Sequence, residues 1–128
     1  MTDKKVIRTE RGWAGHFICA DKCKYRRNTL LNYDDIYIVV STVGNLVFLG
    51  KREEIGCDRY YETMAFFSRD EDKIYHDANV EKQIYFDSNW RLGEDNIDWG
   101  KVDLQADEMH ETVVKEITEK LEKGEIKK

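Results

Sequence analysis

The chain has 128 residues and a net charge of −5 at pH 7, and 37% of its residues are charged. This length favours one domain, and a hydrophobic content of 41% is too high for a disordered chain. The negative charge disfavours non-specific binding to nucleic acid, and no apolar run approaches the roughly 20 residues that a membrane span needs.

The cysteines and the first residues predict the compartment. Cys19, Cys23 and Cys57 are an odd number for a disulfide framework, and residues 1–11 lack the apolar segment of a signal peptide. We therefore expect a reduced, soluble, intracellular protein with no membrane association.

The first quarter of the chain predicts an edge element, a strand and a loop. Residues 1–10 are mostly polar, with Val6 and Ile7 as the only apolar anchor, which predicts a short edge strand or a frayed end. Alternation of side chains predicts a strand at 13–19. Residues 20–34 lack alternation and are rich in cations, so we expect a long loop there, with at most a helical turn.

The middle of the chain predicts an antiparallel sheet. Residues 36–43 are apolar on both faces, as in a central strand. Gly44 and Asn45 predict a two-residue hairpin turn, after which residues 46–49 return antiparallel. The remaining predictions are a polar connector at 50–56, strands at 59–67, 73–77 and 83–87, and a loop at 88–103.

The last element is predicted to be a helix at about residues 104–123. Ala106, Met109 and Val113 begin an apolar stripe at helical spacing, and Gly124 suits the position after the helix. The predicted fold is therefore α+β. One domain, residues 1–128, has a twisted antiparallel sheet of about five or six strands packed on one C-terminal helix.

The arginine pair at 26–27 marks the main candidate binding site. Guanidinium groups bind phosphate or carboxylate with two parallel hydrogen bonds, and aromatic side chains can stack a base. No glycine-rich phosphate loop is present. The alternative is a solvated loop whose arginines pair with acids such as Asp34, Asp35 and Glu62. The candidate binding residues are Trp13, Tyr25, Arg26, Arg27, Asn28, Thr29, Tyr60, Tyr61 and Glu62.

Acidic clusters on predicted turns form a second candidate surface. Carboxylates spaced in this way can imitate phosphates and occupy a basic groove on a partner protein. The alternative is that these segments are ordinary solubilising loops. The candidate partner-binding acids are Asp70, Glu71, Asp72, Glu94, Asp95 and Asp98.

Metal or thiol chemistry is a weaker alternative. His16, Cys19 and Cys23 are residue types that bind zinc, but a strand at 13–19 would place His16 and Cys19 on opposite faces. Neighbouring cations would favour the Cys23 thiolate, with His16 as the nearest base in the sequence. We favour the interpretation with no metal, no cofactor and no catalytic residue, in which Cys19 is a core side chain and Cys23 a loop thiol.

Three long phrases carry a resemblance: ERGWAGHFICADKCKYRRNTLL, IYIVVSTVG and EEIGCDRYYETMAFF. They resemble a group of small uncharacterised bacteriophage and prophage proteins. Phrases like RGWAGHFxCAxxCxxRRNTLL, VVSTVG and RYYETMxF recur in that group, with a C-terminal helix containing MHE. The likeness covers residues from about 10 to 123. It implies a phage setting and synthesis in the host bacterial cytoplasm, and it brings no known activity.

The resemblance favours binding over catalysis, since small accessory phage proteins often act by binding. The leading interpretation is a non-enzymatic protein that counters host immunity. Its leading case is an anti-CRISPR inhibitor that binds a nucleic-acid-handling host effector through acidic loops and exposed aromatics. One alternative is a sponge for a nucleotide second messenger, held by the arginines and tyrosines. The other is a thiol- or zinc-dependent enzyme. A homodimer joined through a strand edge or the helix is also compatible with the sequence.

Overall fold

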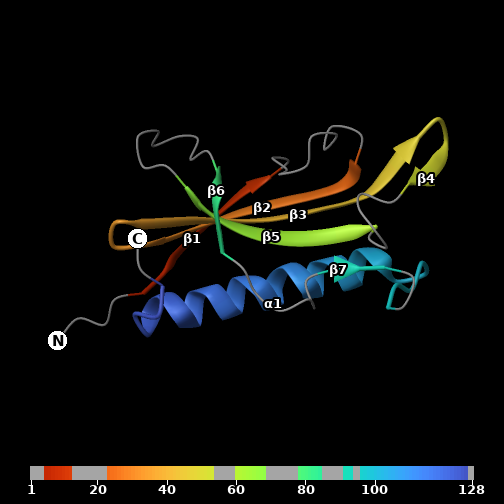
Figure 1. The fold of residues 1–128 in the computed structure, drawn as a ribbon. Helices are drawn as coiled ribbons and strands as arrows, with labels where there is room; N and C mark the ends of the chain where they lie inside the picture. Colours follow the sequence, from red (N-terminus) through yellow and green to blue (C-terminus); the bar gives the residue numbers. More distant parts are fainter. Residues whose placement is uncertain are drawn as a thin grey trace.

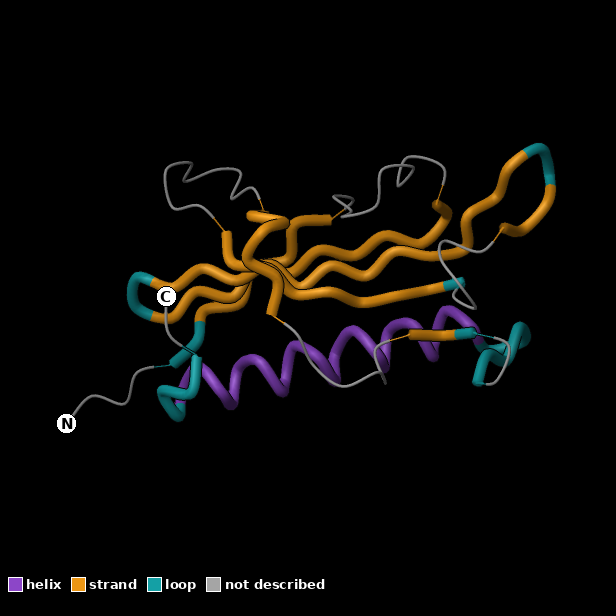
Figure 2. Tube along the Cα trace, in the orientation of Figure 1, coloured by secondary structure: helices purple, strands orange, loops and turns teal. Residues whose placement is uncertain are grey.

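The computed structural model describes residues 5–12, 23–53, 60–68, 78–84, 91–93 and 96–126. In these ranges an antiparallel sheet packs on one C-terminal helix, which confirms the predicted α+β fold (Figure 1). The helix runs along one face of the sheet (Figure 2). The elements are β1 (Ile7–Gly12), β2 (Cys23–Tyr33), β3 (Ile36–Phe48), β4 (Lys51–Glu53), β5 (Tyr61–Ser68), β6 (Ala78–Ile84), β7 (Arg91–Leu92) and α1 (Val102–Glu122).

The strands follow the order β1-β2-β3-β5-β6, and the short strands β4 and β7 pair with β3 and β5. The apolar segment predicted as a central strand is the core of β3, the middle strand of this order. β1 lies at one end, so the prediction of an edge strand near the N-terminus is confirmed for residues 7–10. The strand predicted at 59–67 is β5, and β6 overlaps the strand predicted at 83–87 only at 83–84. The strands predicted at 13–19 and 73–77 lie outside the described residues.

The prediction of a long loop at 20–34 is wrong for the described part of that segment. Residues 23–33 form β2, which pairs antiparallel with β1 on one side and with β3 on the other. Polar side chains such as Arg27 and Thr29 occupy positions that face the helix, so the usual alternation of apolar and polar residues is lost. Tertiary pairing on both edges therefore makes a strand of a sequence that lacks the pattern of one.

The predicted hairpin turn at Gly44–Asn45 is also wrong, because β3 continues through both residues to Phe48. The turn lies at Leu49 and Gly50, whose φ angles are 52° and 77°. Positive φ at both central residues is typical of the tight turn that matches strand twist. The predicted polar connector at 50–56 therefore begins with a strand, β4, which pairs with the end of β3.

Gly44 has a packing role instead. It lies opposite Tyr61 in the pairing of β3 with β5, and Tyr61 is fully buried. A Cβ atom on Gly44 would stand 2.0 Å from Cδ2 of Tyr61, far inside van der Waals contact. Only glycine leaves room for this ring, which also meets the edge of Tyr25 at 5.9 Å between centroids.

α1 begins two residues before the predicted start and ends at Glu122, and its predicted apolar stripe is buried. Gly124 has φ 72°, and the amides of Gly124 and Glu125 donate to the carbonyl oxygens of Leu121 and Lys120. These two bonds form a Schellman motif, so the predicted role of Gly124 is confirmed. Within the described ranges, no helix has the length and hydropathy that a membrane span requires.

Candidate functional site

β2 divides the predicted binding residues between the two faces of the sheet. Successive side chains of a strand point to opposite faces, so Arg26 and Asn28 lie on one face and Arg27 and Thr29 on the other. Arg27 and Thr29 contact α1, which identifies theirs as the helix face. The four residues therefore cannot form the single site that a loop would have allowed.

A polar layer lies between the sheet and α1. Its centre is His110, a helix residue that is 0% exposed. Apolar clusters lie on both sides of it along the helix: one contains Val113 and Ile117, and the other contains Ala106 and Met109. A histidine at this position needs hydrogen-bond partners, because burial removes its water.

The sheet supplies those partners as two threonines, Thr29 and Thr42, and each of these has a further partner on a neighbouring strand. His110 Nε2 lies 2.7 Å from Thr29 Oγ1, and Nδ1 lies 2.7 Å from Thr42 Oγ1. Thr42 Oγ1 is 2.6 Å from Thr63 Oγ1, and Thr29 donates to Glu10 Oε2 at 3.0 Å. We call these five residues the His110 network. β1, β2, β3, β5 and α1 each contribute one residue to it.

The direction of each hydrogen bond follows from the carboxylate at one end. Thr29 donates its single hydroxyl hydrogen to Glu10, so its oxygen must accept a hydrogen bond from the Nε2–H group of His110. In the neutral ring Nδ1 then accepts from Thr42, and Thr42 in turn accepts from Thr63. Every hydrogen bond in this series is therefore donated in the direction of Glu10, and His110 carries its hydrogen on Nε2.

An ion cluster covers the Glu10 end of this network. Arg8 binds both carboxylate oxygens of Glu111, at 2.8 and 2.6 Å, and also contacts Glu10. Arg27 lies 3.2 Å from Glu10, 3.4 Å from Glu111 and 3.8 Å from Asp107. Two cations therefore face three carboxylates. Arg27 is thus bound by acidic side chains of the protein itself, as the alternative interpretation expected. These acids are not Asp34, Asp35 or Glu62, which the sequence had suggested.

Burial and charge shift the pKa values of these groups. Desolvation, reinforced by the nearby Arg27 charge, lowers the pKa of His110 to about 4, so the ring is neutral at pH 7. The hydrogen bond from Arg8 lowers the pKa of Glu111. Burial opposes ionisation of Glu10, but hydrogen bonds from Arg8 and Thr29 outweigh it and lower its pKa. Burial and a hydrogen bond to Asp107 raise the pKa of Tyr25.

The network can order the helix on the sheet, but its geometry does not suggest catalysis. His110 is enclosed, and both of its ring nitrogens are already engaged by threonines. A general base must reach a substrate proton, and this ring cannot do so without opening the interface. The candidate residues predicted from the sequence did not include His110, Thr63, Arg8 or Glu10. The available signal was a histidine next to the apolar helix stripe, together with threonines in apolar strands.

A third group lies at the N-terminal end of α1. Tyr60 meets the edge of Trp99 at 5.1 Å between ring centroids, and the Arg52 guanidinium lies 4.0 Å from the Trp99 ring centroid. Trp99 is 36% exposed. We call Arg52, Tyr60 and Trp99 the aromatic patch. Asp98 lies beside it and accepts a hydrogen bond from the Gly100 amide at 3.0 Å, so this acid shapes its own turn.

The face of the sheet opposite the helix holds other predicted residues. Arg26 and Glu62 flank Val43 on neighbouring strands, and Asn28 lies opposite Ser41. Asn28, Ser41 and Glu62 are buried. Asn28 Oδ1 accepts no hydrogen bond from any described residue. This face is therefore not an open anion-binding surface in the described structure.

Several predicted residues lie outside the described ranges. Among the described residues, no group of three or more His, Cys, Asp or Glu side chains is arranged to hold a metal ion. Cys23 is described only as a residue of β2, and its partners in the proposed triad are not described, so the zinc and thiol hypotheses stay predictions. The residues outside the description are Trp13, His16, Cys19, Asp70, Glu71, Asp72, Glu94 and Asp95.

Comparison with known proteins adds no assignment: no family model, no curated protein and no solved structure matches this chain.

Arg27→Met is expected to lower the free energy of unfolding by about 1–2 kcal/mol at pH 7, because three part-exposed carboxylates lose a shared cation. Urea denaturation measures this change. Lys115→Met is the matched control, since it removes one cation from an exposed helix position and should change stability by less than about 0.5 kcal/mol. Equal effects of the two variants would show that the ion cluster contributes nothing.

Proposed function

We propose that this chain is a non-catalytic binding protein of phage origin that counters host immunity. The leading case is an anti-CRISPR inhibitor of a nucleic-acid-handling host effector, made and acting in the bacterial cytoplasm. The phage resemblance of its longest phrases supports the setting. The polar side chains of the His110 network hydrogen-bond to one another inside the protein, so they are not placed to act on a substrate, which supports binding over catalysis.

The aromatic patch is the observation that carries the proposal. Tryptophan, tyrosine and arginine are the residue types that most often dominate binding energy at protein interfaces. Here they are packed against one another before any partner arrives, so little side-chain entropy remains to be lost. Leu104, on the first turn of α1, is 57% exposed and extends the apolar area near this end of the helix.

The charge of α1 supports a basic partner. The helix has more acids than bases, and most of these side chains are exposed. Such a surface steers positively charged proteins and repels nucleic acid itself. Nucleic-acid-handling proteins carry basic grooves, so they suit this helix. The acids are Asp103, Asp107, Glu108, Glu111, Glu116, Glu119 and Glu122, and the bases are Lys115 and Lys120.

The described contacts support the nucleotide-sponge alternative less than the neighbouring arginines and tyrosines of the sequence did. Arg26 and Arg27 lie on opposite faces of β2, and Arg27 is bound by carboxylates. One phosphate therefore cannot engage both guanidinium groups. The enzyme alternative has no supporting observation among the described residues, and both alternatives stay open to the experiment below.

The test uses bacterial strains that each carry one defence system, with CRISPR systems among them. We expect the protein to restore phage plaquing in a CRISPR strain and to co-purify with the effector. Trp99→Ala should weaken that binding by about 30-fold, the size of a 2 kcal/mol hot spot. Leu49→Asn is the control. It removes an 88% exposed apolar side chain at positive φ, which asparagine tolerates.

Three results would contradict the proposal. The first is that every defence system stays intact when the protein is expressed. The second is a purified protein that consumes a substrate without a partner. The third is binding of a nucleotide signal that Arg26→Ala abolishes, which would favour the sponge. Melting curves of Trp99→Ala and Leu49→Asn should stay close to the unmodified protein, so that lost binding is not lost folding.

A further inference from the structure

β1 ends the strand order of the described sheet and pairs with β2 along one edge. The side chains of residues 7–10 are exposed, and Ile7 is 64% exposed. Every second residue of an edge strand turns its N–H and C=O groups outward, where another strand can pair with them. The β1 edge is therefore a template for strand addition.

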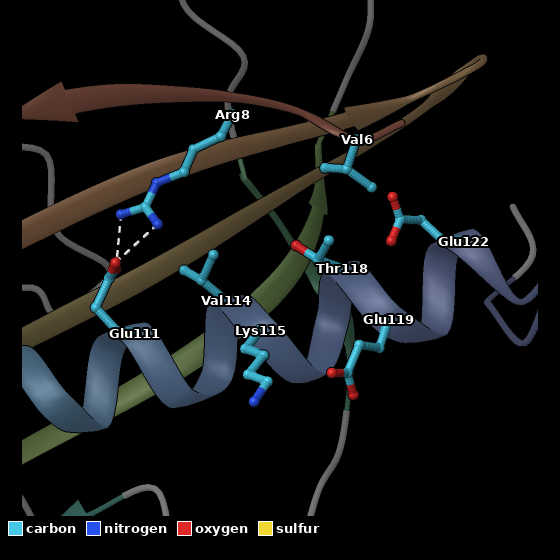
Figure 3. A pocket seen from close by; sticks show the side chains of 8 residues that line it. All are labelled: Val6, Arg8, Glu111, Val114, Lys115, Thr118, Glu119 and Glu122. Atoms are coloured by element: carbon cyan, nitrogen blue, oxygen red, sulfur yellow. Dashed lines mark hydrogen bonds and ion pairs between the residues drawn. The ribbon is translucent and has the colours of Figure 1, made fainter. Parts of the chain in front are cut away.

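A groove of about 520 Å³ lies beside this edge, between β1 and α1 (Figure 3). The Arg8–Glu111 ion pair crosses from strand to helix and bounds one end of it. Val6, Val114 and Thr118 line the gap beyond this pair. The groove thus combines an apolar lining with a fixed, charged boundary.

The charge of the groove is slightly negative. Arg8 and Glu111 neutralise each other, which leaves Lys115 against Glu119 and Glu122 among the groove-lining residues. The excess carboxylate lies toward the C-terminal end of α1, away from the Arg8–Glu111 pair (Figure 3). A ligand that fits must therefore place apolar side chains beside the valines and a cation near Glu119 or Glu122.

We propose that the β1 edge and this groove bind an extended segment of a partner protein by strand addition. The segment pairs its backbone with β1. Side chains on one of its faces enter the groove, with small apolar residues against Val6 and Val114 and one lysine or arginine at Glu119 and Glu122. This surface is separate from the aromatic patch, so it goes beyond the proposed function and does not depend on the identity of the host target.

The probe is a fluorescein-labelled peptide, Thr-Val-Thr-Val-Thr-Lys-Thr, whose alternate positions place two valines and the lysine on one face. Its reverse sequence is tested beside it, since either strand direction is possible. Fluorescence anisotropy should show saturable binding of one of the two. Hydrogen exchange should slow at alternate amides of β1 when the peptide is bound.

Two comparisons separate strand addition from simple charge attraction. Two peptides are N-methylated, one at the odd and one at the even positions, because only one of these sets has its N–H groups facing β1. The peptide methylated at that set cannot donate to β1 and should bind at least about tenfold more weakly than the other. Glu119→Gln with Glu122→Gln should weaken binding about fivefold to tenfold. The matched pair Asp103→Asn with Glu108→Gln removes the same charge from exposed positions in the N-terminal part of α1, and it should leave peptide binding unchanged.

The proposal is overturned by failure of both peptides to bind. Binding that survives both N-methylation and the Glu119 and Glu122 substitutions also overturns it. A third overturning result is a stable dimer of this chain whose β1 amides are already protected without peptide, because a second copy would then occupy the edge. None of these outcomes tests the aromatic patch or the defence target, so the proposed function stands or falls separately.

Discussion

His110→Ala is expected to destabilise the protein by about 3–5 kcal/mol at pH 7, measured by urea or thermal unfolding. The change opens a cavity between two apolar clusters, and it leaves the hydroxyls of Thr29 and Thr42 without their buried partner. Thr112→Ala is the control on the same helix. Thr112 is exposed and bonds only the Glu108 carbonyl among the described residues, so its loss should be nearly neutral.

The same variant tests the pH dependence of the network. The pKa of His110 is about 4 in the folded state against 6.5 for the ordinary side chain, so the unfolded chain holds more protons between these values. Stability from the neutral ring is complete above pH 6.5 and falls as the pH drops toward 4, by about 3 kcal/mol. The stability gap between the unmodified protein and His110→Ala should narrow by this amount. A gap that is constant from pH 7 to 4 would contradict the buried neutral imidazole.

Gly44→Ala is expected to be the most damaging single methyl addition in the described sheet, with a loss of about 3 kcal/mol or more of unfolding free energy. The new Cβ would collide with the ring of Tyr61, which is itself fully buried and cannot move aside. β3 and β5 would have to separate or Tyr61 would have to leave its rotamer. Thermal unfolding of the purified variant measures the loss.

The control for Gly44 is Gly100→Ala. The nearest atom to a Cβ at position 100 is Asp98 Oδ1 at 3.4 Å, and Gly100 has no positive φ angle. Its substitution should therefore change stability by less than about 0.5 kcal/mol. The double variant Gly44→Ala with Tyr61→Leu should recover part of the loss, because a smaller side chain leaves room for the methyl. A Gly44→Ala protein as stable as Gly100→Ala would refute this packing.

The central part of β3 and the helix α1 could be predicted from the sequence, because each buries apolar side chains that recur at a regular spacing. Residues 36–43 are apolar or hydroxyl-bearing at every position, which suits a strand enclosed on both faces. The helix stripe repeats every three or four residues, and Gly124 ends it. Such patterns are properties of one segment of the chain, so they do not depend on which elements pack beside it.

β2 could not be predicted in the same way, because its order of polar and apolar residues depends on the distant residues that its side chains contact. Arg27 and Thr29 are polar yet face the helix, because Glu10, His110 and Glu111 are there to bind them. These partners lie up to 84 residues away in sequence. A strand that alternates between a polar layer and a second buried face has no periodicity that its own residues reveal.

The α+β class, the central strand, the amphipathic helix and its glycine cap could be predicted from the residues alone, since these features follow from local hydrophobic period and turn chemistry. The positions of the charged and hydroxyl side chains depend instead on how the strands and the helix pack together, and the fold sets them. It divided the Arg26–Thr29 set between two faces, and it joined His110 to β2 and β3 directly and to β1 and β5 through Thr29 and Thr42. The physical reason is that a buried polar group must find its partner wherever the fold places one, and that position is not a local property of the chain.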